Sequence, residues 1–267
     1  VREPLRDRNF RRYLRFTGTL TFAIAFVPQF VWLYLFDVVG ASKTKANVML
    51  VMAPMLVFMI ALPWWGRLID HLGRKPVMVI SSLLIVPGSA VWIFVTGEHW
   101  MLGYAAVLLV TFAWPGIELA GFNVMLGFVD RKSGRRAGSA YIAINSAVVA
   151  AAGVLSGLFG GTLASLLNDW QGSLFGVALT YHGLLFIISG LLRLLASMWL
   201  WRLEDDAAMP TRDAVRYMAV NMYSNLQQVV FFPVRRLGDL GRFSYRVTPL
   251  RRIKVIAKRA TRKANGE

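Results

Sequence analysis

The sequence contains no cysteine, and its three histidines are widely separated along the chain. Disulfide bonds and thiolate metal sites are therefore excluded, and the histidine spacing predicts no metal centre. Charged residues are also scarce, at 16% of the 267 residues. No glycine-rich phosphate loop, H-E-x-x-H pattern or nucleophile elbow occurs. We therefore expect no enzyme activity, no cofactor and no ATP-driven transport by this chain alone.

Hydrophobic residues dominate what remains, at 56% of the chain, with nine Trp and 17 Phe. A soluble domain of this length could not bury so much apolar surface. Six uncharged or nearly uncharged stretches are each long enough to cross the hydrocarbon core of a bilayer as a helix. The sequence therefore predicts an all-α membrane protein, a six-helix bundle with spans at 16–36, 46–65, 76–95, 101–129, 138–167 and 174–201.

The distribution of Lys and Arg predicts how these spans are oriented. Six basic residues lie in 1–15, three between the second and third spans and four between the fourth and fifth, whereas the opposite loops contain only Lys43 and Lys45. Positively charged loops stay in the cytoplasm. We therefore expect a multi-pass protein of the plasma (inner) membrane with both termini cytoplasmic. The predicted domains are a basic linker at 1–15, a transmembrane bundle at 16–201 and a cytoplasmic tail at 202–267.

The net charge of +16 is not interpreted as nucleic-acid binding, because nearly all of the basic residues outside the spans lie on one side of the predicted membrane topology. In the tail, Pro210 and Thr211 form a plausible helix start, and apolar residues follow at helical spacing up to Val229. Beyond them, eleven Lys and Arg are opposed only by Asp239 before the final Glu267. We expect an amphipathic surface helix, then a polybasic segment that lies on anionic lipid headgroups or stays disordered.

The loop between the second and third spans contains the most specific pattern, GRLIDHLGRKP from residue 66 to residue 76. Gly66 and Gly73 allow a tight turn and a close approach of two helix ends. Asp70 precedes Arg74 by four residues, a spacing that suits a charge-assisted pair, and Arg67 and Lys75 can reach phosphates. The alternative is that this is simply a short basic loop that sets the topology.

The pattern G-x-x-x-D-x-x-G-R-K resembles the loop signature of the major facilitator superfamily. The opening PLRDRNFRRYLRF resembles the linker that enters the second six-helix bundle of such transporters, and WPGIELAGFN resembles the corresponding helix of bacterial members. The resemblance implies the carboxy-terminal half of a secondary transporter that moves a small solute by alternating access, coupled to an ion gradient. It also implies that Asp70 and Arg74 form a gate pair that closes the cytoplasmic side.

A complete transporter of this kind has two six-helix bundles, and this sequence encodes one. We expect either a fragment, since the sequence begins with Val rather than Met, or a half that pairs with a separate second half. The runner-up interpretation is a non-transporting six-span scaffold whose basic tail recruits lipid or a protein partner.

Glu118 is the acidic residue deepest in any span, and a carboxylate at that depth predicts a function. It could contact substrate, carry a coupling proton, or bond a neighbouring helix as a structural group. Pro115 and Gly116 just before it could allow the helix to bend. Whichever role it has, we expect Glu118 to face protein or water rather than lipid.

Other polar residues inside the spans are weaker candidates. Gln29, Asn123 and Asn145 could contact solute in a cavity, although a lone amide in a span more often bridges two helices. Arg193 lies about two turns before the end of the last span, and we expect its side chain to snorkel to the cytoplasmic face. Glycines recur at 153, 157 and 161, which predicts a packing surface for a neighbouring helix.

Overall fold

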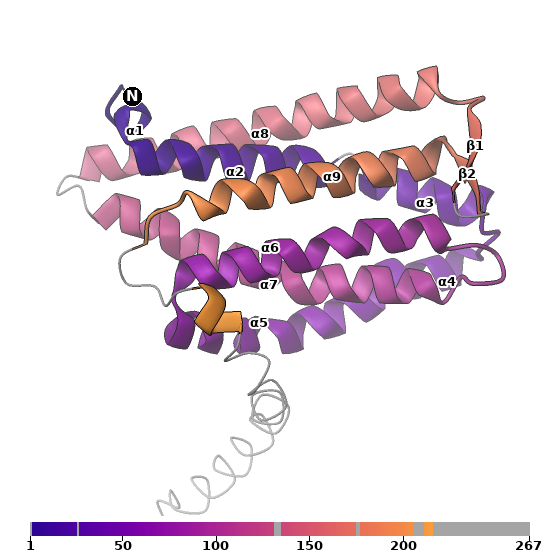
Figure 1. Cartoon of the computed structure of the whole chain (residues 1–267), viewed down its shortest axis with the longest axis horizontal. Helices are drawn as coiled ribbons and strands as arrows, with labels where there is room; N and C mark the ends of the chain where they lie inside the picture. The colour runs from indigo at the N-terminus through magenta and orange to yellow at the C-terminus, as the bar shows by residue number, and fades with distance from the viewer. Residues whose placement is uncertain (1, 26, 131–134, 175–176, 206–210, 216–267) are drawn as a thin grey trace, which may run out of the picture. The chain divides into compact units, whose positions relative to one another are not determined.

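The computed structural model confirms an all-α membrane protein. Within the described residues, six helical segments are long and apolar enough to cross a membrane: Arg8–Asp37, Lys43–Leu72, Arg74–Phe94, Leu102–Val129, Gly138–Leu166 and Tyr181–Trp201. They run back and forth along the long axis of the bundle, which is horizontal in Figure 1. The structure describes residues 2–25, 27–130, 135–174, 177–205 and 211–215.

The first two spans are each interrupted. The first consists of α2 (Arg8–Ala25) and α3 (Val27–Asp37), and the second of α4 (Lys43–Asn47), a π-helical turn (Val48–Met52) and α5 (Ala53–Leu72). Pro28 at the start of α3 has no N–H group with which to continue the hydrogen-bond ladder of α2. A π-turn inside an α-helix is frequently associated with a functional site, so the interruption of the second span marks a region of interest.

The remaining spans are formed by more regular helices. The third consists of α6 (Arg74–Val91) and a 3-10 turn (Trp92–Phe94), and the next three of α7 (Leu102–Asp130), α8 (Arg135–Leu166) and α9 (Tyr181–Trp201). Although α7 contains Pro115, it stays one continuous α-helix. At Gly116 the neighbouring helices leave no room for a side chain. A Cβ there would lie 2.7 Å from Trp65 Cδ2 in α5 and against Ser81 Oγ in α6, so both helices pack closely on α7.

Two predicted boundaries are wrong. The last span begins at Tyr181 rather than at residue 174, because β1 (Gln171–Leu174) and β2 (Val177–Thr180) pair antiparallel and give Leu174 and Val177 a strand partner. The first span also begins earlier than residue 16, since its helix starts at Arg8. A short helix α1 (Arg2–Arg6) precedes α2, and α2 passes through the predicted boundary without a break.

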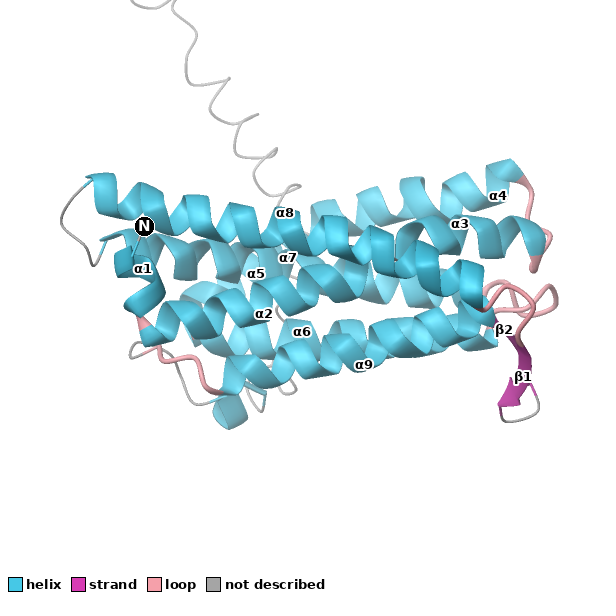
Figure 2. Cartoon of the chain, turned by 90° about the horizontal axis from the view of Figure 1, so that it is seen from above, coloured by secondary structure: helices cyan, strands magenta, loops and turns pink. Residues whose placement is uncertain are grey.

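The helices differ greatly in how much of their surface the bundle covers. Helix α6 packs on α7 and α9, α2 packs on α9 and α8, and α5 packs on α7. In the most apolar part of each span, 56% of the residues of Arg74–Phe94 are buried, against 17% for Lys43–Leu72 and 11% for Gly138–Leu166. Figure 2 shows α6 and α9 along one edge of the bundle and α8 along the opposite edge. Helices α5 and α8 therefore present long uncovered faces.

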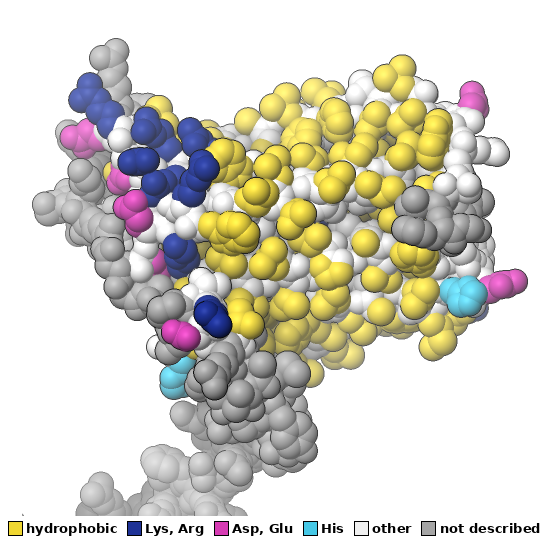
Figure 3. Space-filling view, viewed as in Figure 1, with side chains coloured by type: hydrophobic (Ala, Val, Ile, Leu, Met, Phe, Trp, Pro, Cys, Tyr) yellow, Lys and Arg dark blue, Asp and Glu magenta, His cyan; other side chains and the backbone are white. Residues whose placement is uncertain are grey.

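Basic side chains gather at the end of the bundle where α1 lies, and a broad hydrophobic band separates them from the opposite end (Figure 3). This is the charge asymmetry expected for positively charged loops on one side of a membrane. The predicted tail helix and polybasic segment lie outside the described residues, except for 211–215, which are helical.

Candidate functional site

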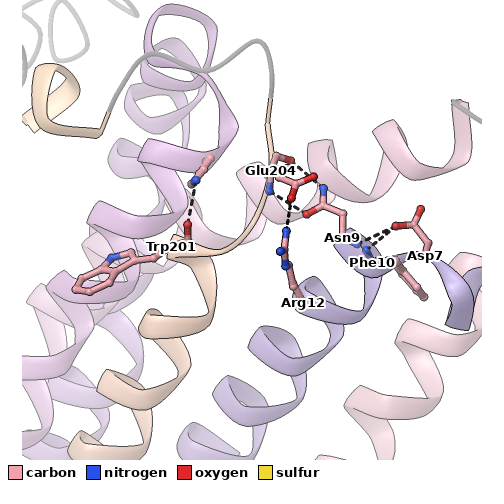
Figure 4. Close-up of polar contacts among 7 residues, drawn as sticks. Asp7, Asn9, Phe10, Arg12, Trp201 and Glu204 are labelled. Atoms are coloured by element: carbon pink, nitrogen blue, oxygen red, sulfur yellow. Dashed lines mark hydrogen bonds and ion pairs between the residues drawn. The ribbon is translucent and has the colours of Figure 1, made fainter.

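A polar cluster at the basic end joins the start of α2 to the end of α9 (Figure 4). Asn9 exchanges two hydrogen bonds with the backbone of Glu204: its Nδ2 donates to the carbonyl oxygen at 2.8 Å, and its Oδ1 accepts from the amide at 2.9 Å. Arg12 forms an ion pair with the Glu204 carboxylate, and this hydrogen bond lowers the pKa of Glu204 below its ordinary value. The cluster holds the first and last spans together at this end.

The glycine and arginine residues of the loop motif form a sharp break between α5 and α6. Gly73 adopts φ +89°, a conformation that L side chains rarely adopt, and Arg74 begins the next helix. Arg74 Nη1 donates to the carbonyl oxygen of Asn123 in α7 at 2.9 Å, and Lys75 Nζ donates to the carbonyl oxygen of Trp201. The motif therefore ties the α5–α6 turn to α7 and α9.

Among the described residues, the expected ion pair between Asp70 and Arg74 is not formed in this conformation. The spacing argument assumed one continuous helical turn, but the helix ends at Leu72, and the Arg74 guanidinium turns towards α7 instead. Asp70 and Arg74 nevertheless line the same recess of about 470 Å³, together with Asn123. Gly66 and Arg67 lie in the last two turns of α5. The role of these residues as a gate stays a prediction.

A second, open cavity of about 510 Å³ lies within the bundle. Residues of α2, α3 and α7, ranging from buried to exposed, form its walls, and buried residues of α6 and α9 form its floor. The interrupted parts of the first two spans both border it, through Ala25 and Val27 on one side and Leu50 on the other. Its other lining residues include Thr21, Pro28, Trp32, Ile85, Gly88, Trp92, Val110, Thr111, Trp114 and Arg193.

Arg193 does not snorkel, contrary to the prediction. Its side chain is 5% exposed and lines the cavity, and its Nη1 donates to the carbonyl oxygen of Ile85 in α6 at 3.1 Å. Cα–Cβ bonds tilt towards the amino-terminal end of a helix, which in α9 is the end away from Trp201. The side chain therefore leans away from the basic end, from a position about 12 Å along the helix from that end.

The structure does not bring the predicted solute-contact residues together. Asn123 borders the recess at the basic end, and Asn145 Oδ1 accepts a hydrogen bond from Thr17 Oγ1 at 3.2 Å, which bridges α8 to α2. Gln29 lies in α3 between two cavity-lining residues, Pro28 and Val31, but its side chain is outside the described ones. Glu118 is exposed and has no side-chain hydrogen bond or ion pair among the described residues. It lies one helical turn beyond Trp114, which lines the cavity.

The cavity residues escaped sequence analysis because most of them are ordinary apolar side chains. Trp32, Trp92 and Trp114 look the same in sequence as other aromatic residues of a membrane helix. Two signals could have drawn attention to the region: Pro28 inside a predicted span, and Arg193 more than two turns from the end of its helix. The glycines at 153, 157 and 161 have no packing partner in the described bundle, since a Cβ at each would meet nothing within 4 Å, and their role as a packing surface stays a prediction.

The described residues form six membrane-length helices, and five of them line a cavity large enough for a small organic molecule, which defines a polytopic membrane protein with a solute-sized site. The sequence matches the Major Facilitator Superfamily over residues 5–256, and the chain therefore belongs to this family of membrane transporters. This confirms the predicted family, the all-α membrane fold and the absence of an enzymatic function. No curated protein shows significant similarity to the chain.

Proposed function

We propose that this chain takes part in secondary transport of a small solute by alternating access, driven by an ion gradient. The observation that carries the proposal is the 510 Å³ cavity, which five of the six spans line and which lies where two of those spans are interrupted. Solute and ion sites of secondary transporters lie near the middle of the membrane, beside discontinuous helices. The basic end of the bundle is proposed to face the cytoplasm in the inner membrane.

The chain is further proposed to act as the carboxy-terminal half of a transporter, with a second six-helix bundle supplying the opposite cavity wall. The uncovered faces of α5 and α8 support this, because large side chains such as Met59 (71% exposed) and Val154 (66%) have no partner helix in the described bundle. The uncovered glycines of α8 would allow another helix to approach closely. The basic tail is proposed to lie on anionic lipid.

Glu118 is the proposed coupling residue. It lies on the same side of α7 as Trp114 and the exposed Phe122, so it borders the region between the cavity and the recess at the basic end. A carboxylate at this depth in a membrane protein is costly unless it has a function. Among the described residues, the Glu118 side chain has no hydrogen bond or ion pair with a neighbouring helix. The structural alternative for Glu118 therefore has no support there.

The accessibility of Thr111 tests alternating access without knowledge of the solute. The chain lacks cysteine, so Thr111→Cys introduces a single thiol in the cavity wall. We expect a membrane-impermeant thiol reagent to label it from both sides, in right-side-out and in inside-out vesicles, because the cavity opens to each side in turn. Ala113→Cys, two residues along α7 and fully buried, is the matched control and should stay unlabelled.

Two further single cysteines calibrate the sides of the membrane. Ser42→Cys should react only from outside, and Ser133→Cys only from the cytoplasmic side. Labelling of Thr111→Cys from one side only would contradict alternating access and favour the scaffold interpretation. Labelling of Ser42→Cys from the cytoplasmic side would contradict the orientation.

The gate proposal makes a separate prediction for Asp70. If the recess around Asp70 and Arg74 closes the cytoplasmic side, Asp70→Asn should raise the rate at which Thr111→Cys is labelled from that side. A gate contact worth about 1 kcal/mol corresponds to about a fivefold change. Asp169→Asn, an exposed carboxylate at the opposite end, is the control and should leave the rate unchanged. An unchanged rate in Asp70→Asn would reduce the motif to a topology signal.

A further inference from the structure

Arg193 is a buried cation without a matching anion. Among the described residues, no carboxylate forms an ion pair with it, and its Nε has no hydrogen-bond partner. Its one recorded side-chain hydrogen bond goes to the neutral carbonyl of Ile85. A guanidinium is always charged, and burial of an unpaired charge among apolar groups is costly. Arg193 therefore brings to the cavity a positive charge and an N–H group that no anion or acceptor of the described bundle satisfies.

The lining of the cavity limits which anion can pair with that charge. Arg193 is the only charged residue among the described lining residues, so the cavity suits a ligand with a single negative charge. Most of the remaining lining is aliphatic or aromatic, including three tryptophans, with hydroxyl groups from Thr21 and Thr111. A sugar or a multiply charged ion would lose far more hydrogen bonds to water than this lining replaces.

The size of the cavity fits the same class. A volume of about 510 Å³ lies within the range of pockets that enclose small organic ligands, and far exceeds the needs of a halide ion. Arginine binds carboxylates through parallel N–H groups, and aromatic walls bury the apolar body of such a ligand. The positive charge at the floor therefore suits the carboxylate group of such a ligand, and the apolar walls suit the rest of the same molecule.

We propose that this cavity binds an amphipathic organic monoanion, a carboxylate with an aromatic or aliphatic body, and that Arg193 receives its anionic group. The inference rests on the proposed transport function, since it names the class of solute that would occupy the transporter's cavity. Trp32, Trp92 and Trp114 would enclose the apolar body.

Pairs of acids and their amides test the inference. The full chain is placed in phosphatidylcholine nanodiscs and titrated calorimetrically with benzoate and benzamide, 2-naphthoate and 2-naphthamide, and indole-3-acetate and indole-3-acetamide. Each pair shares a body and differs in charge. We expect at least one acid to bind about tenfold or more tightly than its amide, because a hydrogen-bonded charge contributes that much. No preference for the acid in any pair would overturn the proposal.

Variants assign the preference to Arg193. Arg193→Gln should remove it, and Arg193→Lys should retain part of it. The control is Arg202→Gln, an exposed arginine just beyond the same helix, which should bind as the wild type does. If Arg193→Gln does not yield folded protein, the acid–amide preference of the wild type and the Lys variant still decide the proposal. A full preference in a folded Arg193→Gln variant would overturn it.

The source of the anion is tested in the same assay. Nanodiscs that contain phosphatidylglycerol should leave the acid affinity unchanged if the ligand is a soluble acid. Loss of affinity there would overturn the soluble source in favour of a lipid. The transport proposal and the anion-site proposal fail on different results. Two-sided labelling of Thr111→Cys without an acid preference would overturn only the anion site. An acid preference with one-sided labelling would overturn only transport.

Discussion

Gly116→Ala is expected to lower the thermal unfolding midpoint of the bundle by about 5 °C. The added Cβ would meet Trp65 Cδ2 at 2.7 Å, and it would also contact Ser81 Oγ. Neither neighbour can move easily. Trp65 is fully buried and its Nε1 donates to the carbonyl oxygen of Phe112 at 2.6 Å, while Ser81 Oγ donates to the carbonyl oxygen of Val77 at 2.7 Å. Overpacking of this kind costs about 1–3 kcal/mol, more than the helix propensity of alanine restores.

Gly153→Ala is the matched control. Both residues are helical glycines within a membrane span, but a Cβ at Gly153 meets nothing within 4 Å in the described bundle. Its midpoint should stay within about 1 °C of the wild type or rise slightly, since alanine favours the helix. Thermal unfolding of both variants in detergent, followed by tryptophan fluorescence, makes the comparison. Equal midpoints for the two variants would contradict the close packing of α5, α6 and α7 around Gly116.

Glu118→Gln is expected to abolish the response of the transporter to a proton gradient. In the wild type, an imposed pH difference should change the ratio of Thr111→Cys labelling from the two sides by about tenfold, because protonation of an intramembrane carboxylate biases the two conformations. The amide keeps the shape of the side chain but does not take up the proton. The ratio in Glu118→Gln should therefore not depend on the gradient, whereas Glu98→Gln, an exposed acid in a loop, should respond as the wild type does.

A structural role for Glu118 predicts different behaviour. If the carboxylate served to bond another helix, Glu118→Gln would retain the response, and Glu118→Leu would lower the unfolding midpoint through a lost contact worth about 1 kcal/mol. The exposed position of Glu118 leads us to expect little change in that midpoint. A full gradient response in Glu118→Gln would remove this residue from the coupling mechanism.

Both glycine-rich features of the sequence were interpreted as sites of close approach or turning, and the structure separates them. Gly73 turns the chain at φ +89°, and its neighbour Arg74 then bonds α7 rather than Asp70. At Gly153, Gly157 and Gly161 of α8, by contrast, an added Cβ would meet nothing within 4 Å in the described bundle. Spacing along the chain predicts which residues share one face of a helix, but the helix must continue through them, and the spacing does not identify what that face meets.

Local composition determined most of the membrane architecture. Insertion into a bilayer depends on hydrophobicity and charge summed along a segment. The sequence alone was therefore sufficient to recognise six apolar stretches, the one-sided distribution of Lys and Arg, and the loop motif from Gly66 to Lys75. The boundary error at residue 174 arose in the same way, since an apolar strand and the start of an apolar helix have similar composition.

Only the tertiary structure decided where the cavity lies and what it contains. Thr21 and Arg193 border it from the first and last spans, and three other spans also supply lining residues. Their meeting depends on how each helix is rotated and how closely it packs, which follows from contacts between side chains distant in sequence. The sequence around Arg193 is compatible with a side chain that reaches the membrane surface and equally with one that is buried at the floor of a cavity. Its direction from α9 towards the carbonyl of Ile85 distinguishes the two, because only packed helices place that carbonyl within its reach.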